Sequence, residues 1–238
     1  MTIARVRPGL RRVALAVATI AVCSAGAAFA HDVAEGDRGY IATTKGVQIG
    51  AFFYLGAKHM VTGYDHVLFL MGVIFFLYRL RQVAAYVTLF AIGHSTTLIL
   101  GILFRTSVNA YLIDAIIALS VVYKALDNIG AFQRWFGVSP NPRVIVLIFG
   151  FFHGLGLATK LQDLGLSSDG LLANLIAFNL GVETGQFLAL AAILIAMGYW
   201  RRTKGFARHA LAANVALMTA GLILFGQQMA GYFLGVSA

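Results

Sequence analysis

Histidine and carboxylate side chains interrupt several long apolar stretches of this sequence. The segment His59-Met-Val-Thr-Gly-Tyr-Asp65-His66 holds two imidazoles and one carboxylate within eight residues. On a continuous helix, His59 and His66 would share one face, and Gly63 between them permits a bend. Imidazole and carboxylate are ligands of divalent transition metals, although a carboxylate can instead orient an imidazole by a hydrogen bond. The segment is therefore a candidate metal site, with a polar cap at the water boundary as the alternative.

Three more polar residues lie deep within apolar runs: His94, His153 and Glu183. A charged or strongly polar side chain in hydrocarbon costs roughly 2.5–3.5 kcal/mol on the insertion scale, so such residues face the protein interior and usually mark function. We predict that His94 is a metal ligand, with hydrogen-bonded packing as the alternative, and that His153 is a ligand or a gate. Glu183 must be protonated, paired across helices or bound to a cation.

Weaker polar candidates accompany these positions. Asn179, Glu183 and Gln186 follow i, i+4, i+7 spacing and would share a helix face. The Ser95 hydroxyl follows the second intramembrane histidine and could serve a metal site or a contact between helices. Asp114 lies near the outer end of its apolar run, where a divalent cation would arrive.

The first thirty residues have the pattern of a secretory signal peptide. A region with four arginines precedes an apolar run from Val13 to Val22, and Ala28-Phe29-Ala30 is a small-x-small cleavage site. Cleavage would remove the single cysteine, leaving the mature chain without a disulfide or a thiolate ligand. An uncleaved signal anchor is the alternative. Cleavage would also make His31 the N-terminus, where its amine and imidazole could chelate a metal, with a disordered polar terminus as the alternative.

The composition is typical of a membrane protein. The 238 residues are 60% hydrophobic and 11% charged, and the mean hydropathy is +0.83. Soluble domains are roughly 45–50% apolar and about 25% charged, so a soluble enzyme, a disordered tail and a nucleic-acid-binding module are excluded. The basic residues lie mostly between apolar runs, where they mark topology.

The apolar runs predict an all-α, polytopic membrane bundle of about six transmembrane helices. We expect a signal peptide at residues 1–30, a polar extracytoplasmic segment at 31–46 and a transmembrane domain at 47–238. A short helix near Gln48–Val61 precedes the spans. The predicted spans are Tyr64–Tyr78, Val83–Phe104, Leu112–Phe132, Val144–Lys160, Leu171–Trp200 and Ala210–Val236.

The loop charges predict the orientation. Alternate loops are basic, which by the positive-inside rule places them in the cytoplasm and the mature N-terminus in the periplasm of a bacterial inner membrane. Two other patterns predict helix packing. Gly150, Gly154 and Gly156 form a small-residue face, and Lys124 and Asp127 are spaced for an ion pair.

Five stretches resemble the HupE/UreJ family of membrane proteins. They are HMVTGYDHVLFL (59–70), LFAIGHSTTL (89–98), IALSVVYKALDNI (117–129), FGFFHGLGLA (149–158) and FNLGVETGQ (178–186). The resemblance implies a nickel permease, or an accessory protein associated with nickel enzymes such as hydrogenase and urease. By that analogy the residues of the metal path are His59, Asp65, His66, His94, His153 and Glu183.

We therefore expect a transporter rather than an enzyme, one that mediates uptake of a divalent transition metal. Nickel comes from the resemblance; the residue types leave zinc and cobalt open. The alternatives are an intramembrane zinc-dependent hydrolase and a metal-binding accessory protein of a nickel enzyme system. The expected partners are the lipid bilayer and the metal ion, with a homo-oligomer or hydrogenase and urease maturation proteins as further candidates, and no nucleic acid.

Overall fold

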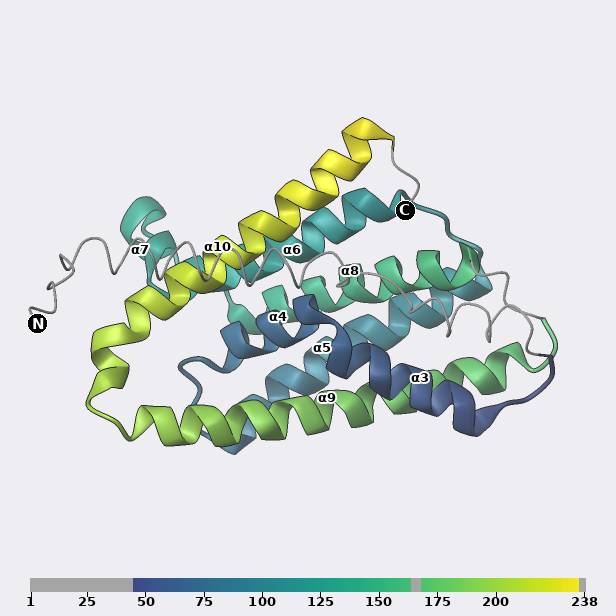
Figure 1. The fold of residues 1–238 in the computed structure, drawn as a ribbon, viewed down its shortest axis with the longest axis horizontal. Coiled ribbons are helices and arrows are strands. Elements are labelled where there is room, and N and C mark those ends of the chain that lie inside the picture. Colours follow the sequence, from purple (N-terminus) through teal and green to yellow (C-terminus); the bar gives the residue numbers. More distant parts are fainter. Residues whose placement is uncertain (1–44, 164–167, 236–238) are drawn as a thin grey trace, which may run out of the picture.

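The computed structural model describes residues 45–163 and 168–235, which form helices and, within these ranges, no strands (Figure 1). The helices are α3 (Ile49–Thr62), α4 (Tyr64–Ile74), α5 (Leu80–Leu103), α6 (Ala110–Asn128), α7 (Ala131–Phe136), α8 (Pro142–Asp163), α9 (Leu171–Arg201) and α10 (Gly205–Leu234). The predicted all-α class is confirmed. The predicted signal peptide and His31 lie outside the described residues.

Four of the described helices are long and apolar enough to cross a membrane: α5, α8, α9 and α10. They correspond to four of the six predicted spans. The other two spans differ from the prediction. Helix α4 has only 11 residues and ends at Ile74, and α6 carries three charged residues, two Asp and one Lys, and ends at Asn128 rather than continuing to Phe132. Gly130, at φ +70°, adopts a left-handed conformation that interrupts the helix before α7.

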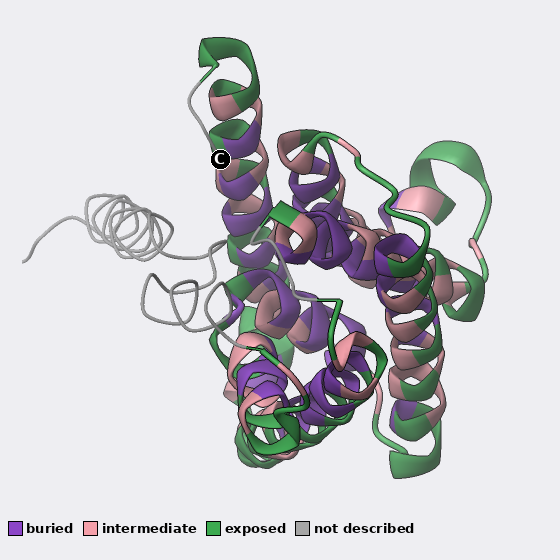
Figure 2. Cartoon of the chain, turned by 90° about the vertical axis from the view of Figure 1, so that its right-hand side faces the viewer, coloured by how far each residue is buried: buried purple, intermediate pink, exposed green. Residues whose placement is uncertain are grey.

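The helices pack mainly as three pairs, α3 with α9, α5 with α8 and α6 with α10. Glycines allow the backbones to approach closely. A Cβ added at Gly56 of α3 would lie 2.0 Å from the carbonyl oxygen of Phe178, and one at Gly181 of α9 would lie 2.0 Å from that of Phe53. Figure 2 shows buried residues facing inward between the helices and exposed residues on the outside.

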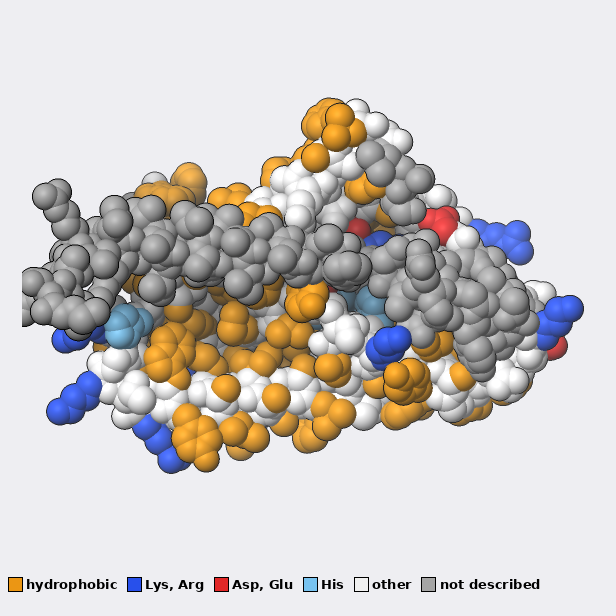
Figure 3. Space-filling model, viewed as in Figure 1, with side chains coloured by type: hydrophobic (Ala, Val, Ile, Leu, Met, Phe, Trp, Pro, Cys, Tyr) orange, Lys and Arg blue, Asp and Glu red, His pale blue; other side chains and the backbone are white. Residues whose placement is uncertain are grey.

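The outer surface of the bundle is apolar. In Figure 3, hydrophobic side chains cover the flank along α9. The exposed residues of this helix include Ile176, Leu180, Phe187, Leu188 and Ile195. In water such a surface would drive association, whereas in a bilayer it contacts acyl chains of similar polarity. Together with the long apolar helices, this surface identifies a membrane protein.

The connecting segments alternate between the two ends of the bundle (Figure 1). Residues 75–82, 129–143 and 201–208 meet at one end and contain eight Lys and Arg residues but no Asp or Glu. We call this the basic end. The structure therefore gathers at one end the loops that the charge pattern assigned to a single side of the membrane.

Polar side chains tie the helices together near the basic end. The predicted ion pair between Lys124 and Asp127 is present, with Nζ and Oδ2 2.5 Å apart. The next residue after Asp127 is Asn128, whose amide donates to the carbonyl oxygen of Gly72 and to Oδ1 of Asn214, each at 2.9 Å. These hydrogen bonds join α4, α6 and α10.

Candidate metal site

A break at Gly63 separates α3 from α4 at the centre of the candidate site. Gly63 is extended (φ −70°, ψ 102°), so His59 ends one helix while His66 lies in the first turn of the next. Their spacing suggested that the two histidines share one face of a continuous helix. The break at Gly63 shows that they lie on two different helices. The break still brings them together, with ring centroids 5.1 Å apart.

Gly63 has no room for a side chain. An added Cβ would lie 2.7 Å from Nδ1 of His66 and 3.1 Å from Oδ1 of Asp65. A non-helical residue at this depth is tolerated in a membrane protein only where it is buried in protein or lines a cavity. The glycine thus allows the backbone to turn directly beside the polar side chains.

Asp65 and His66 form a buried hydrogen bond. Nδ1 of His66 and Oδ1 of Asp65 are 3.0 Å apart, and the two residues are only 3% and 5% exposed. When Nδ1–H donates to the carboxylate, the lone pair of the neutral ring lies on Nε2. The Nε2 atom of His66 is buried without a hydrogen-bond partner. This arrangement suits a metal-ligating imidazole whose tautomer is fixed by a carboxylate.

The paired helices α5 and α8 supply His94 and His153. A Cβ at Gly154 would lie 2.0 Å from the carbonyl oxygen of His94, so α8 contacts α5 at the level of both histidines. The Thr97 hydroxyl reinforces this contact by donating to the carbonyl oxygen of Phe151 at 2.7 Å. The glycine face predicted on α8 is partly confirmed: Gly150 and Gly154 face α5, whereas Gly156 faces α6.

Four imidazoles converge around His66. Its ring centroid lies 5.1 Å from that of His59, 5.0 Å from that of His153 and 6.1 Å from that of His94. Ligand atoms of Asp65, His66 and His153 lie within 4.8 Å of one another, a spacing at which one ion could contact all three. We call the four histidines and Asp65 the histidine cluster.

The ring nitrogens of the histidine cluster are suited to bind a cation. Nε2 of His59 and both ring nitrogens of His94 are buried without hydrogen-bond partners. In His153, Nδ1 donates to the carbonyl oxygen of Phe149 at 2.7 Å, which places the lone pair of a neutral ring on Nε2. Unpartnered polar atoms in an apolar interior are costly unless a ligand satisfies them. The donor set of imidazoles and one carboxylate fits nickel, cobalt or zinc.

Apolar residues surround the histidine cluster. The ring of Phe90 lies 4.9 Å from that of His153 and is stacked on His94 at 6.0 Å. Phe69, also buried, lies 5.5 Å from His153. Sequence reasoning missed both phenylalanines, because aromatic residues are common throughout the chain. Phe69 lies one turn from His66 on α4, and Phe90 lies one turn from His94 on α5. This spacing could have indicated that both rings lie beside the site.

The structure does not bring Glu183 into the histidine cluster. Gly181 and Gly185 of α9 face α3, and Glu183, two residues from each, lies on the opposite side of the helix, where it is exposed. Asn179 and Gln186 are buried, at 6% and 1% exposure. On the continuous helix α9 the three residues lie within one sector, as their spacing predicts, but Glu183 is at its exposed edge whereas the two amides are buried.

The structure also describes the two remaining secondary candidates, Asp114 and Ser95. Asp114 is 4% exposed and its Oδ2 accepts a hydrogen bond from Nζ of Lys160 at 2.7 Å, an ion pair between α6 and α8 that sequence reasoning missed. Ser95 is half-buried beside His94 on α5. Apart from His31, every predicted candidate is thus placed, and five of the six principal ones converge.

The fold and site define a polytopic helical membrane protein with a histidine-rich site in its interior. A family model described as HupE / UreJ protein matches residues 35–236, which include every helix described above. The chain belongs to the HupE/UreJ family, as its five motifs indicated. The comparisons with curated proteins and with solved structures find no match.

Proposed function

We propose that this protein is a permease that takes up a divalent transition metal across the bacterial inner membrane, with nickel as the first candidate. The observation that carries the proposal is the histidine cluster: imidazoles from four helices meet in the interior of an apolar bundle. The family is associated with nickel or cobalt transport or with an accessory function. Both fit a site at which imidazoles replace the hydration shell of the ion.

The membrane potential would drive the ion inward without ATP. One elementary charge gains about 2.3 kcal/mol in crossing 100 mV, so a divalent ion gains about 4.6 kcal/mol. We place the basic end in the cytoplasm and the mature N-terminus in the periplasm, following the charge of the loops. The site must hold the ion weakly enough to release it. Mostly neutral ligands, with a single carboxylate from Asp65, fit that requirement.

The decisive experiment is metal flux into proteoliposomes under an imposed potential, paired with metal accumulation in expressing cells. We expect His66→Ala and His94→Ala to abolish nickel flux. The matched control is His209→Ala, because His209 is exposed near the start of α10, outside the histidine cluster. Equal flux in His66→Ala and the unmodified protein would overturn the proposal.

Glu183→Gln forms a separate arm of this experiment. Glu183 was predicted to belong to the metal path, yet it lies on the exposed side of α9. Reduced flux in this variant, with folding and metal affinity unchanged, would assign the carboxylate a role in transport away from the histidine cluster. Unchanged flux would remove it from the metal path.

A second candidate function is an intramembrane metal-dependent hydrolase. The proximity of Asp65, His66 and His153 favours it, because catalytic zinc has three protein ligands and one open position that activates water. A hydrolase would retain zinc through purification and would show no flux in sealed vesicles. The accessory-protein alternative predicts copurification with subunits of a nickel enzyme or its maturation proteins.

A further inference from the structure

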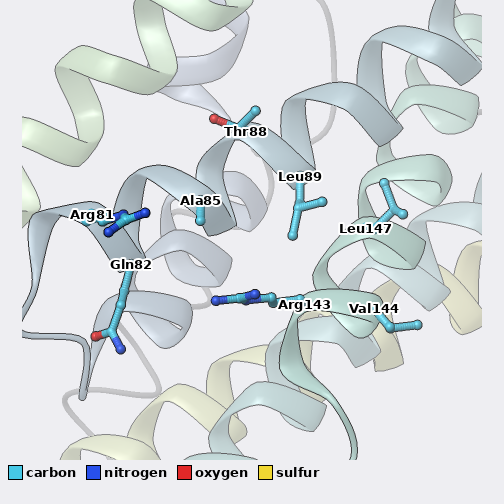
Figure 4. A pocket seen from close by; sticks show the side chains of 8 residues that line it. All are labelled: Arg81, Gln82, Ala85, Thr88, Leu89, Arg143, Val144 and Leu147. Atoms are coloured by element: carbon cyan, nitrogen blue, oxygen red, sulfur yellow. The ribbon is translucent and has the colours of Figure 1, made fainter.

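A groove between α5 and α8 opens at the basic end, away from the histidine cluster. Figure 4 shows Arg81 and Gln82 on one side of the groove and apolar side chains on the other, with the Arg143 side chain extended between them. The apolar lining includes Leu89, Val144 and Leu147. The groove is thus divided into a cationic part and an apolar part.

The cationic part carries two guanidinium groups without acidic partners. In the described residues, no carboxylate forms an ion pair with Arg81 or Arg143, whereas Lys124 and Lys160 are both paired. Arg81 and Arg143 are exposed and come from different helices. Two arginines that flank one pocket form a fork-shaped set of donors suited to a phosphate group.

The two helices add to this positive potential. Helix α5 begins at Leu80 and α8 at Pro142, so both helices direct their N-termini toward the groove. The N-terminus of a helix carries about half a positive elementary charge. The dipoles and the arginines therefore favour the same kind of ligand, an anion.

The apolar part of the groove argues against a small soluble anion as its natural occupant. Leu89 and Leu147 are half-buried and lie about two turns from Arg81 and about one turn from Arg143, respectively, on helices long and apolar enough to cross the bilayer. The groove therefore leads from the charged end of the bundle toward hydrocarbon depth. A ligand that fills it needs a phosphate at one end and an apolar chain at the other.

We propose that this groove binds an anionic phospholipid, with its headgroup phosphate between Arg81 and Arg143 and an acyl chain along Leu89 and Leu147. The lipid would bridge α5 and α8, the two helices that carry His94 and His153. Basic pockets between transmembrane helices are general sites for anionic headgroups. The site is independent of which metal the protein handles.

The test uses the purified full-length protein in detergent, titrated with phosphatidylglycerol or phosphatidylcholine and followed by native mass spectrometry and thermal unfolding. We expect preferential binding of phosphatidylglycerol, and about thirtyfold weaker binding in the double variant Arg81→Gln/Arg143→Gln. The matched control is Arg208→Gln, which removes an exposed arginine near the start of α10 but outside the groove. Leu89→Trp fills the apolar part and should weaken lipid binding without changing the charge.

Three outcomes would overturn the proposal. Equal binding of both lipids would show that the arginines do not select the headgroup. An equal effect of Arg208→Gln would show a general charge effect of the basic end. Inorganic phosphate could protect the protein against thermal unfolding as well as phosphatidylglycerol does, while Leu89→Trp leaves lipid binding unchanged. These two results together would identify a phosphate site rather than a lipid site.

Discussion

The position of Gly154 fixes how closely the backbone of α8 approaches His94. A Cβ at this position would lie 2.0 Å from the carbonyl oxygen of His94 and 2.3 Å from Oγ1 of Thr97. The adjacent residue, His153, is only 1% exposed and faces the histidine cluster. The close contact between α5 and α8 and the geometry of the candidate metal site therefore depend on the same glycine.

Gly154→Ala should separate α5 from α8 at the level of the histidine cluster. The methyl group would collide with the backbone of His94 as well as with the Thr97 hydroxyl, and overpacking of this kind costs about 1–3 kcal/mol. We expect a lower free energy of unfolding and weaker metal binding, measured by thermal unfolding and by metal titration in detergent. Gly226→Ala is the control, because an added Cβ there meets nothing within 4 Å. Equal effects of the two variants would contradict the role of Gly154.

Asp65→Asn should weaken metal binding while leaving the fold intact. The asparagine oxygen can still accept the hydrogen bond from Nδ1 of His66, but the side chain carries no charge to offset that of the metal. Loss of a carboxylate that orients a metal-binding histidine typically lowers affinity about 10–100-fold. Competition with a chelator measures the change. The control is Asp163→Asn, because Asp163 is an exposed carboxylate at the end of α8. Unchanged metal affinity in Asp65→Asn would exclude the Asp65 carboxylate from the site.

Lys160→Met should destabilise the protein by leaving the Asp114 carboxylate buried without its ammonium partner. Removal of one member of a buried ion pair costs about 3–5 kcal/mol. We expect a smaller loss here, because the side chain of Lys160 is 21% exposed. The double variant Lys160→Met/Asp114→Leu removes both charges and should recover part of the loss. Thermal unfolding of the unmodified protein, the two single variants Lys160→Met and Asp114→Leu, and the double variant forms a double-mutant cycle. A double variant no more stable than Lys160→Met would disprove this account.

Arg201→Met should loosen the end of α4. The guanidinium donates to the carbonyl oxygens of Ile74 and Phe75 and lies 4.7 Å from the centre of the Tyr78 ring. Hydrogen bonds to a charged group contribute about 1.5–3 kcal/mol. We expect faster amide hydrogen exchange in residues 72–79, measured by mass spectrometry. The control is Arg202→Met, because Arg202 is an exposed neighbour of Arg201. This variant should leave amide exchange in residues 72–79 unchanged. Equal exchange rates in Arg201→Met and Arg202→Met would refute the prediction.

The sequence predicts which polar residues face the interior better than it predicts how each helix is rotated. His66, His94 and His153 interrupt apolar runs, and the cost of placing them in hydrocarbon is enough to predict that they turn inward. The same reasoning fails for Glu183, which faces outward. The rotation of α9 is set by Gly181 and Gly185, which must face α3 because only glycine allows the backbones to approach so closely.

Contacts between distant segments were beyond sequence reasoning. Lys160 and Asp114 are 46 residues apart, and Arg201 contacts carbonyl oxygens more than 120 residues earlier in the chain. Each of these residues is unremarkable in its local segment. By contrast, the ion pair between Lys124 and Asp127 was predictable, because a separation of three residues on a helix fixes the distance between the side chains.

The distribution of the histidines over the helix pairs couples metal binding to the arrangement of the bundle. His59 belongs to the unit of α3 and α9, whereas His94 and His153 belong to the unit of α5 and α8. A slide of one unit along the other would change the distances from His59 to His94 and His153 without opening a glycine contact inside either unit. An ion that bridged the imidazoles would hold the two units in one relative position, and by thermodynamic linkage a displacement of one unit would weaken the binding of the ion by the same factor.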